Sequence, residues 1–103
     1  GLLAHKLADT LKVEVNGRVV QTVDRADKWL AQTPQMFRYQ ELTYALSHAD
    51  LAQVTDEASA VELVGGVVQV VESDAPNIKV TFPFDLKLAQ MIINSYLEDG
   101  VYV

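Results

Sequence analysis

Side chains able to do catalytic chemistry are few and scattered in this chain. There is no cysteine, which excludes disulfides, thiolate zinc sites and a cysteine nucleophile. His5 and His48 are isolated, with no second histidine at the spacing of a metal site. No serine lies in a nucleophile-elbow sequence, and the glycines form no phosphate-binding pattern. From residue types alone, the chain holds no complete catalytic site.

Composition narrows the class of partner. The 8 Lys and Arg residues stand against 14 Asp and Glu residues, a formal net charge of -6. An acidic chain repels nucleic-acid phosphates and anionic lipid, so we expect neither a nucleic-acid nor a membrane partner. The apolar runs are too short to span a bilayer, and no secretory signal pattern opens the sequence. With 103 residues, 50% of them hydrophobic, the chain suits one small domain or a piece of a larger one.

The clearest local element is a β-hairpin over Lys12–Val23. Two β-rich runs flank Asn16-Gly17, a pair that tolerates the positive φ angles of a type I′ turn. An isolated two-stranded hairpin is barely stable in water, so this one must lie on other protein surface. It is either an ordinary surface hairpin or an arm that packs on a partner subunit.

The sequence also predicts three helices. Thr33-Pro34 is expected to interrupt regular secondary structure before the first helix, which covers Tyr39–His48. The buried face of this helix would consist of Leu42, Ala45, Leu46 and Ala49. The second begins with Thr55 as N-cap and ends at Gly65-Gly66. The third begins at Pro83, ends at Asp99-Gly100 and buries a face of Leu86, Ala89, Ile93 and Tyr96.

Two short apolar runs between the second and third helices read as strands. They are Val67–Val71 and Asn77–Thr81. The resulting order of hairpin, helix, helix, strand, strand and helix indicates an α/β or α+β fold.

Five short strings, in one order, carry a family resemblance. They are Asp9-Thr10, Thr22–Arg25, Gln32–Phe37, Thr55–Ala60 and Asn77–Thr81. Together they resemble 2-C-methyl-D-erythritol 4-phosphate cytidylyltransferase of the non-mevalonate isoprenoid pathway. The resemblance runs from about Gly1 to Ala89 and matches only the C-terminal part of the family protein, without its glycine-rich nucleotide loop.

The resemblance implies an α/β fold, the C-terminal part of a Rossmann-like nucleotidyltransferase domain with a protruding β-hairpin arm. Residues 1–103 would be a fragment of one such domain, with residues 11–25 as the dimerisation arm. The implied reaction joins CTP and methylerythritol phosphate, with Mg²⁺, into CDP-methylerythritol and pyrophosphate. The Mg²⁺ ligands would lie outside this chain, which alone would be inactive. The implied protein is a homodimer of the bacterial cytoplasm or the plastid.

The resemblance also implies substrate-binding residues. Arg25 and Lys79 would position the sugar-alcohol phosphate, and Thr10, Thr33 and Thr55 would line the same pocket. These residue types suit the chemistry, because two anions must meet: Arg offers a planar fork, Lys a point charge and Thr a neutral hydroxyl. Without the resemblance, Arg25 reads as a solvated surface residue and Thr55 as a helix N-cap.

Two departures and two alternatives accompany this hypothesis. The family usually places a basic residue or Thr before the proline of the third helix and often a basic residue near the hairpin start, where this chain has Phe82 and Val13. Local positive charge is therefore lower than in the family. A related enzyme that activates ribitol 5-phosphate shares several of the strings. The chain could also be a non-catalytic fragment competent only for dimerisation.

Overall fold

A computed structural model describes residues 1–100. The chain contains two separate β-sheets and three α-helices among these residues. The three-stranded sheet has the order β4-β1-β5, with β1 (Leu2–Lys6) in the centre between β4 (Trp29–Gln35) and β5 (Val70–Glu72). β1 is antiparallel to β4 and parallel to β5, so the sheet is mixed and the fold is α/β.

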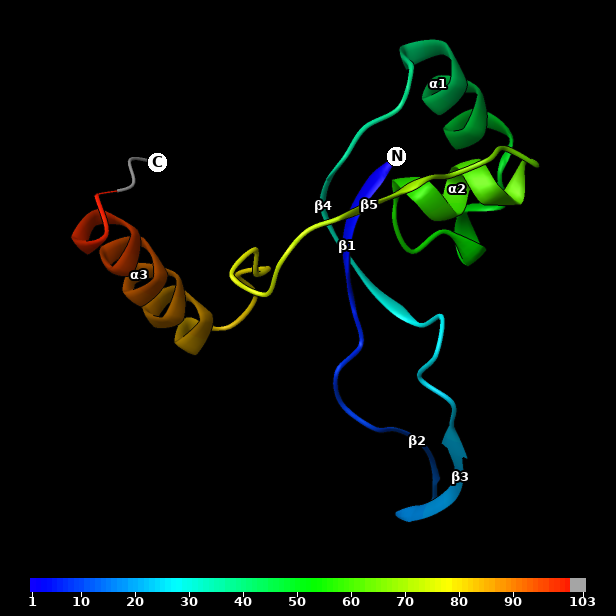
Figure 1. Cartoon of the computed structure of the whole chain (residues 1–103). Coiled ribbons are helices and arrows are strands. Elements are labelled where there is room, and N and C mark those ends of the chain that lie inside the picture. Colours follow the sequence, from blue (N-terminus) through cyan, green and yellow to red (C-terminus); the bar gives the residue numbers. More distant parts are fainter. Residues whose placement is uncertain (101–103) are drawn as a thin grey trace.

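The hairpin forms the second sheet, and its prediction is confirmed. Strand β2 (Leu11–Val15) pairs with β3 (Arg18–Val23) in antiparallel register, with a bulge between Val13 and Glu14. Asn16 and Gly17 have φ angles of 51° and 79°, as a type I′ turn requires. In Figure 1 the hairpin projects from the three-stranded sheet at the end opposite to helix α1.

The small core lies between the first two helices. Helix α1 (Tyr39–His48) has the predicted bounds, and α2 (Glu57–Leu63) follows a 3-10 turn, η1 (Leu51–Gln53). Ala45, Ala60 and Val61 are buried there, with Leu42 and Ala49 packed against them. The prediction that Leu46 is buried is wrong, because 43% of this residue is exposed.

The N-terminus of α2 corrects the predicted cap. The N-cap is Asp56, whose carboxylate accepts a 2.7 Å hydrogen bond from the Ser59 amide, while the Ser59 hydroxyl accepts one of 3.0 Å from the Asp56 amide. Thr55 lies one residue outside this reciprocal capping box. Asp is as good an N-cap as Thr or better, and here Ser59 supplies the second half of the box. The predicted end is correct, because Gly65 follows the C-cap with a φ of 85°.

The structure also differs from the predicted interruption at Thr33-Pro34 and from the two predicted strands after α2. β4 continues through Thr33-Pro34, a cis peptide bond; proline is tolerated because β4 is an edge strand and needs no amide donor on its open side. The run Val67–Val71 contributes only its end to β5. The run Asn77–Thr81 is not a strand, because side chains of other segments hold part of its backbone.

Helix α3 (Pro83–Glu98) begins at Pro83 as predicted and ends before the C-cap Asp99, but its apolar face is not buried. Leu86 is 64% and Ile93 46% exposed. Figure 1 shows α3 apart from the sheet and from the other helices. The radius of gyration is accordingly 17.0 Å, against about 13 Å for a compact domain of this length. The predicted buried face therefore lacks a partner among residues 1–100.

Candidate functional site

A cleft of about 600 Å³ brings several predicted site residues together. It lies between β4, the segment before α2 and the segment after β5. Its lining comprises His5, Leu30, Ala31, Gln32, Thr33, Gln35, Thr55, Asp56, Ala75, Asn77, Ile78 and Lys79. Three of the five predicted substrate-binding residues, Thr33, Thr55 and Lys79, thus line one cleft although they come from three distant parts of the sequence.

Hydrogen bonds to β4 hold the segment that carries Lys79. The side-chain nitrogen of Gln32 donates to the carbonyl oxygens of Asp74 (2.9 Å) and Asn77 (3.0 Å). The side-chain amide of Asn77 in turn donates a hydrogen bond of 2.8 Å to the carbonyl oxygen of Thr33. At the far end, the Asp85 carboxylate accepts from the Thr81 and Phe82 amides at 3.1 and 2.8 Å. These two amide donors lower the pKa of Asp85, because they stabilise its charged form.

The other wall of the cleft is fixed to β4 through Gln35. The side-chain nitrogen of Gln35 donates a hydrogen bond of 2.9 Å to the Asp56 carboxylate. Its side-chain oxygen accepts a hydrogen bond of 3.0 Å from the backbone amide of Ala58. Partial burial acts to raise the pKa of Asp56, but hydrogen bonds from Gln35 and Ser59 outweigh it and lower the pKa. Asp56 is therefore an anion at neutral pH whose oxygens are already engaged in structure.

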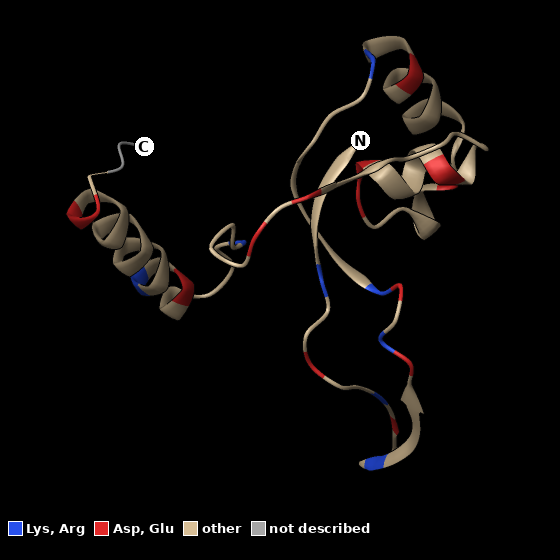
Figure 2. Cartoon of the chain, in the orientation of Figure 1, with Lys and Arg blue, Asp and Glu red and all other residues tan. Residues whose placement is uncertain are grey.

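The cleft is lined by one carboxylate, Asp56, whose oxygens accept from Gln35 and Ser59, and by one ammonium, that of Lys79. Lys79 is the one Lys or Arg among the lining residues, all of which belong to the described part of the chain. Figure 2 shows the Lys and Arg residues spread along the chain, including the hairpin end of the three-stranded sheet. A lone ammonium with neighbouring hydroxyl groups can bind a phosphate as a point charge plus neutral donors.

Arg25 and Thr10 do not line this cleft. Arg25 lies after β3 at the base of the hairpin, where its guanidinium donates to the carbonyl oxygen of Ala8. It borders a separate hollow together with Lys6, Asp24, Asp27 and Lys28. Thr10 is exposed just before β2. Within this chain, Arg25 and Lys79 therefore lie at different surfaces.

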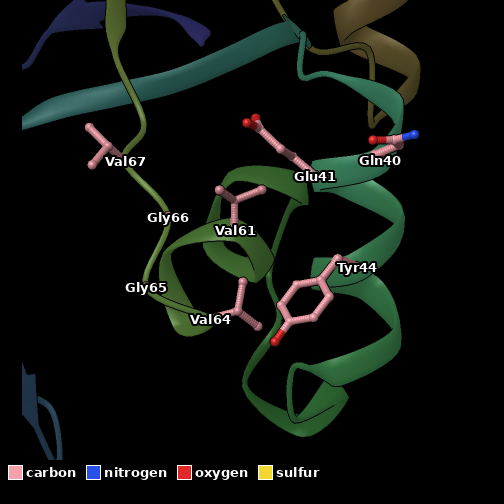
Figure 3. A pocket seen from close by; sticks show the side chains of 8 residues that line it. All are labelled: Gln40, Glu41, Tyr44, Val61, Val64, Gly65, Gly66 and Val67. Carbon is pink, nitrogen blue, oxygen red and sulfur yellow. The ribbon is translucent and has the colours of Figure 1, made fainter.

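A second hollow, of about 500 Å³, lies between α1, α2 and the chain after Gly65 (Figure 3). Its apolar wall consists of Val61, Val64 and Val67, and the Tyr44 ring covers another side. Its one charged lining residue is Glu41, which repels a phosphate. This hollow is therefore a poorer phosphate site than the Lys79 cleft.

The polar cleft residues missed by the sequence predictions are His5, Gln32, Gln35, Asp56 and Asn77. Four of them lie inside or beside the quoted strings, so their position next to Thr33, Thr55 and Lys79 was an available signal. His5 carried no such signal, because only strand pairing places β1 beside β4.

No metal-binding cluster was found within residues 1–100: no group of three or more His, Cys, Asp or Glu side chains is arranged to hold an ion there. Asp56, the one carboxylate of the cleft, already accepts from Gln35 and Ser59. The residues of this cleft therefore do not fit an Mg²⁺ site. None of the helices in the described range is long and apolar enough to cross a membrane.

Comparison with known proteins extends this picture. The family model for 2-C-methyl-D-erythritol 4-phosphate cytidylyltransferase matches residues 1–95. The protein of that name from Laribacter hongkongensis is 55% identical over 94 residues, which cover 90% of this chain and 41% of that protein. This chain thus spans about two-fifths of the length of that curated relative.

Solved structures of the same family share the fold. The 2-C-methyl-D-erythritol 4-phosphate cytidylyltransferase from Thermus thermophilus has a TM-score of 0.79 and 30% identity, over 90% of this chain and 47% of that one. The Francisella tularensis protein of the same name has a TM-score of 0.77 and 41% identity, over 88% and 44% of the two chains. The α/β arrangement is therefore that of part of a cytidylyltransferase domain.

Proposed function

Because this chain belongs to the 2-C-methyl-D-erythritol 4-phosphate cytidylyltransferase family, we propose that its protein joins CTP and 2-C-methyl-D-erythritol 4-phosphate. The products are CDP-methylerythritol and pyrophosphate, in the non-mevalonate route to isoprenoids. The 103 residues supply the acceptor-phosphate site and the dimer arm of one cytidylyltransferase domain.

The observation that carries this proposal is the convergence of Thr33, Thr55 and Lys79 on one cleft. Each comes from a different string of the resemblance, and nothing in their sequence spacing requires them to meet. Their chemistry matches a phosphorylated polyol, because the ammonium of Lys79 attracts the phosphate while the threonine hydroxyls can exchange hydrogen bonds with phosphate or alcohol groups.

The proposed reaction is an in-line displacement. An oxygen of the acceptor phosphate forms a bond to the α-phosphorus of CTP, and the bond from that phosphorus to the bridging oxygen of the β-phosphate breaks. Pyrophosphate leaves with that electron pair. Because both reactants are anions, Lys79 favours the reaction by offsetting their repulsion and by holding the attacking phosphate in place.

Arg25 is proposed to act in the cleft of a second subunit. It lies at the base of the hairpin formed by residues 11–25, outside the Lys79 cleft of its own chain. The hairpin leaves Val19 and Val20 about 60% exposed and pairs with no other strand among the described residues. Packing on a second copy would cover these valines and bring Arg25 and Thr10 toward the partner's cleft.

The proposed cofactor is Mg²⁺, because a divalent cation neutralises the phosphates of a nucleoside triphosphate. Its ligands are proposed to lie outside this chain, and no step above depends on a residue of this chain binding it. As the enzyme of a bacterial or plastid isoprenoid pathway, the protein is proposed to act in the cytoplasm or the plastid.

Pyrophosphate release by the full-length protein tests the function. With CTP and Mg²⁺, we expect release in the presence of methylerythritol phosphate and little with ribitol 5-phosphate. The 103-residue chain alone should release none, because its glycines form no nucleotide-binding loop. Turnover of ribitol 5-phosphate instead would favour the related enzyme, and turnover of neither substrate would favour a role restricted to dimerisation.

A further inference from the structure

Gln32 connects the cleft to the segment that carries Lys79, and sequence reasoning assigned it no role. The segment from Asp74 to Val80 contains no helix or strand. Both donors of the Gln32 amide are used, one on the Asp74 carbonyl at 2.9 Å and one on the Asn77 carbonyl at 3.0 Å. Two residues beyond this second contact lies Lys79.

The orientation of the Gln32 amide is set by these contacts. If the amide were flipped, its oxygen would face two carbonyl oxygens, which repel it; the donors must therefore point toward the segment. The oxygen, Oε1, is then buried without a hydrogen-bond partner among residues 1–100. A buried unpaired acceptor is unfavourable and offsets part of the stabilisation that the two donated hydrogen bonds provide.

We propose that Gln32 is a positioning residue for the acceptor substrate, which acts by holding residues 74–79 so that Lys79 faces the phosphate. This inference rests on the proposed function, since it needs Lys79 to bind that phosphate. Asn77 completes the connection from the other side through its bond to the Thr33 carbonyl. The ammonium of Lys79, on a long flexible stem, is thereby attached to a backbone of defined position.

The test variant is Gln32→Met in the full-length protein. Methionine is nearly the same size, removes both donors and also removes the unpaired oxygen, so global stability should change little. Hydrogen exchange reports the local effect. We expect faster exchange of the Asn77 and Ile78 amides, which bond to the Asp74 and Pro76 carbonyls. Gln90→Met, at an exposed site on α3, is the matched control and should leave both amides unchanged.

Kinetics then separate positioning from a general structural role. In Gln32→Met we expect the KM for methylerythritol phosphate to rise about tenfold, with the KM for CTP unchanged, as expected for the loss of one or two neutral hydrogen bonds. Gln32→Glu should be more severe, because its carboxylate would face two carbonyl oxygens. Gln32→Met combined with Lys79→Ala should be no worse than Lys79→Ala alone, because one acts through the other.

The outcomes distinguish this inference from the function beneath it. Unchanged exchange in Gln32→Met, or strictly additive effects in the double variant, would overturn the positioning role. Faster exchange with an unchanged KM, while Lys79→Ala remains impaired, would overturn it too and leave the proposed function standing. If Lys79→Ala is itself fully active, both the phosphate site and the role of Gln32 are wrong.

Discussion

The side-chain amide of Asn77 donates a 2.8 Å hydrogen bond to the carbonyl oxygen of Thr33, across 44 residues of sequence. This bond joins two residues that line the cleft and attaches to β4 the chain two residues before Lys79. Since Thr33 and Lys79 are both proposed to bind substrate, a single hydrogen bond from a side chain to the backbone relates the positions of a hydroxyl group and a cation.

Replacing Lys79 should weaken the acceptor site selectively. In Lys79→Ala we expect kcat/KM for methylerythritol phosphate to fall about ten- to a hundredfold, the loss expected for one charged hydrogen bond to phosphate. The KM for CTP should stay nearly constant in steady-state kinetics of the full-length protein. Lys87→Ala, on exposed α3, is the control for general loss of positive charge. A collapse of CTP binding would contradict the assignment.

Arg25→Ala should produce a similar loss, and Arg25→Lys should also be impaired because lysine keeps the charge but lacks the planar fork. Arg25 is proposed to serve the partner's cleft and Lys79 its own. A mixed dimer of Arg25→Ala and Lys79→Ala subunits then has one intact cleft. Mixing the two impaired proteins in equal amounts, with subunit exchange, should restore activity to about one quarter of the wild-type value. Absence of any recovery would contradict the sharing of each cleft between two subunits and would indicate that Arg25 and Lys79 of the same chain act together.

Removing the hairpin should weaken the dimer. Deletion of Val13–Val20 removes the turn and the adjoining halves of β2 and β3, with their exposed valines. Because these apolar groups are proposed to lie on the second subunit, we expect a shift toward monomer in sedimentation experiments. A dimer that persists at the same concentration would show that another surface holds the subunits together.

Removing the Asp56 cap should destabilise α2. Asp56→Ala loses the bonds to Ser59 and Gln35, and we expect a decrease of about 1 kcal/mol in the free energy of unfolding, measured in urea at neutral pH. Asp56→Asn, which keeps an acceptor oxygen, should lose less. Equal stability of all three proteins would contradict the capping role.

The same carboxylate predicts a pH dependence. The pKa of Asp56 in the folded protein lies below its ordinary value of 3.8, so folding favours the charged form. Its contribution to stability is full above that value and is lost as the pH falls through the folded pKa. The stability difference between wild type and Asp56→Asn should therefore shrink in acid. A difference that is independent of pH would show that the charge is not involved.

Local chemistry decided what could be predicted from the sequence. The turn at Asn16-Gly17, helix α1, the start of α3 at Pro83 and the end of α2 at Gly65 depend on neighbouring residues, and all are present as expected. The choice of Thr55 as N-cap failed for a local reason, because Asp56 and Ser59 together form a better capping box. The prediction that Thr33, Thr55 and Lys79 share a pocket came from the family motifs and not from periodicity.

Contacts distant in sequence were decided only by the tertiary structure. Pairing of β1 with β4 and β5 makes a strand of the segment around Pro34, because an edge position tolerates a missing amide. Side-chain bonds from Gln32 and Asn77, not strand pairing, hold the segment before Lys79. The spacing of apolar residues in α3 is enough to predict that the helix has an apolar face. Whether that face is buried depends on which other protein surface packs against it, and the sequence of the helix alone does not specify that surface.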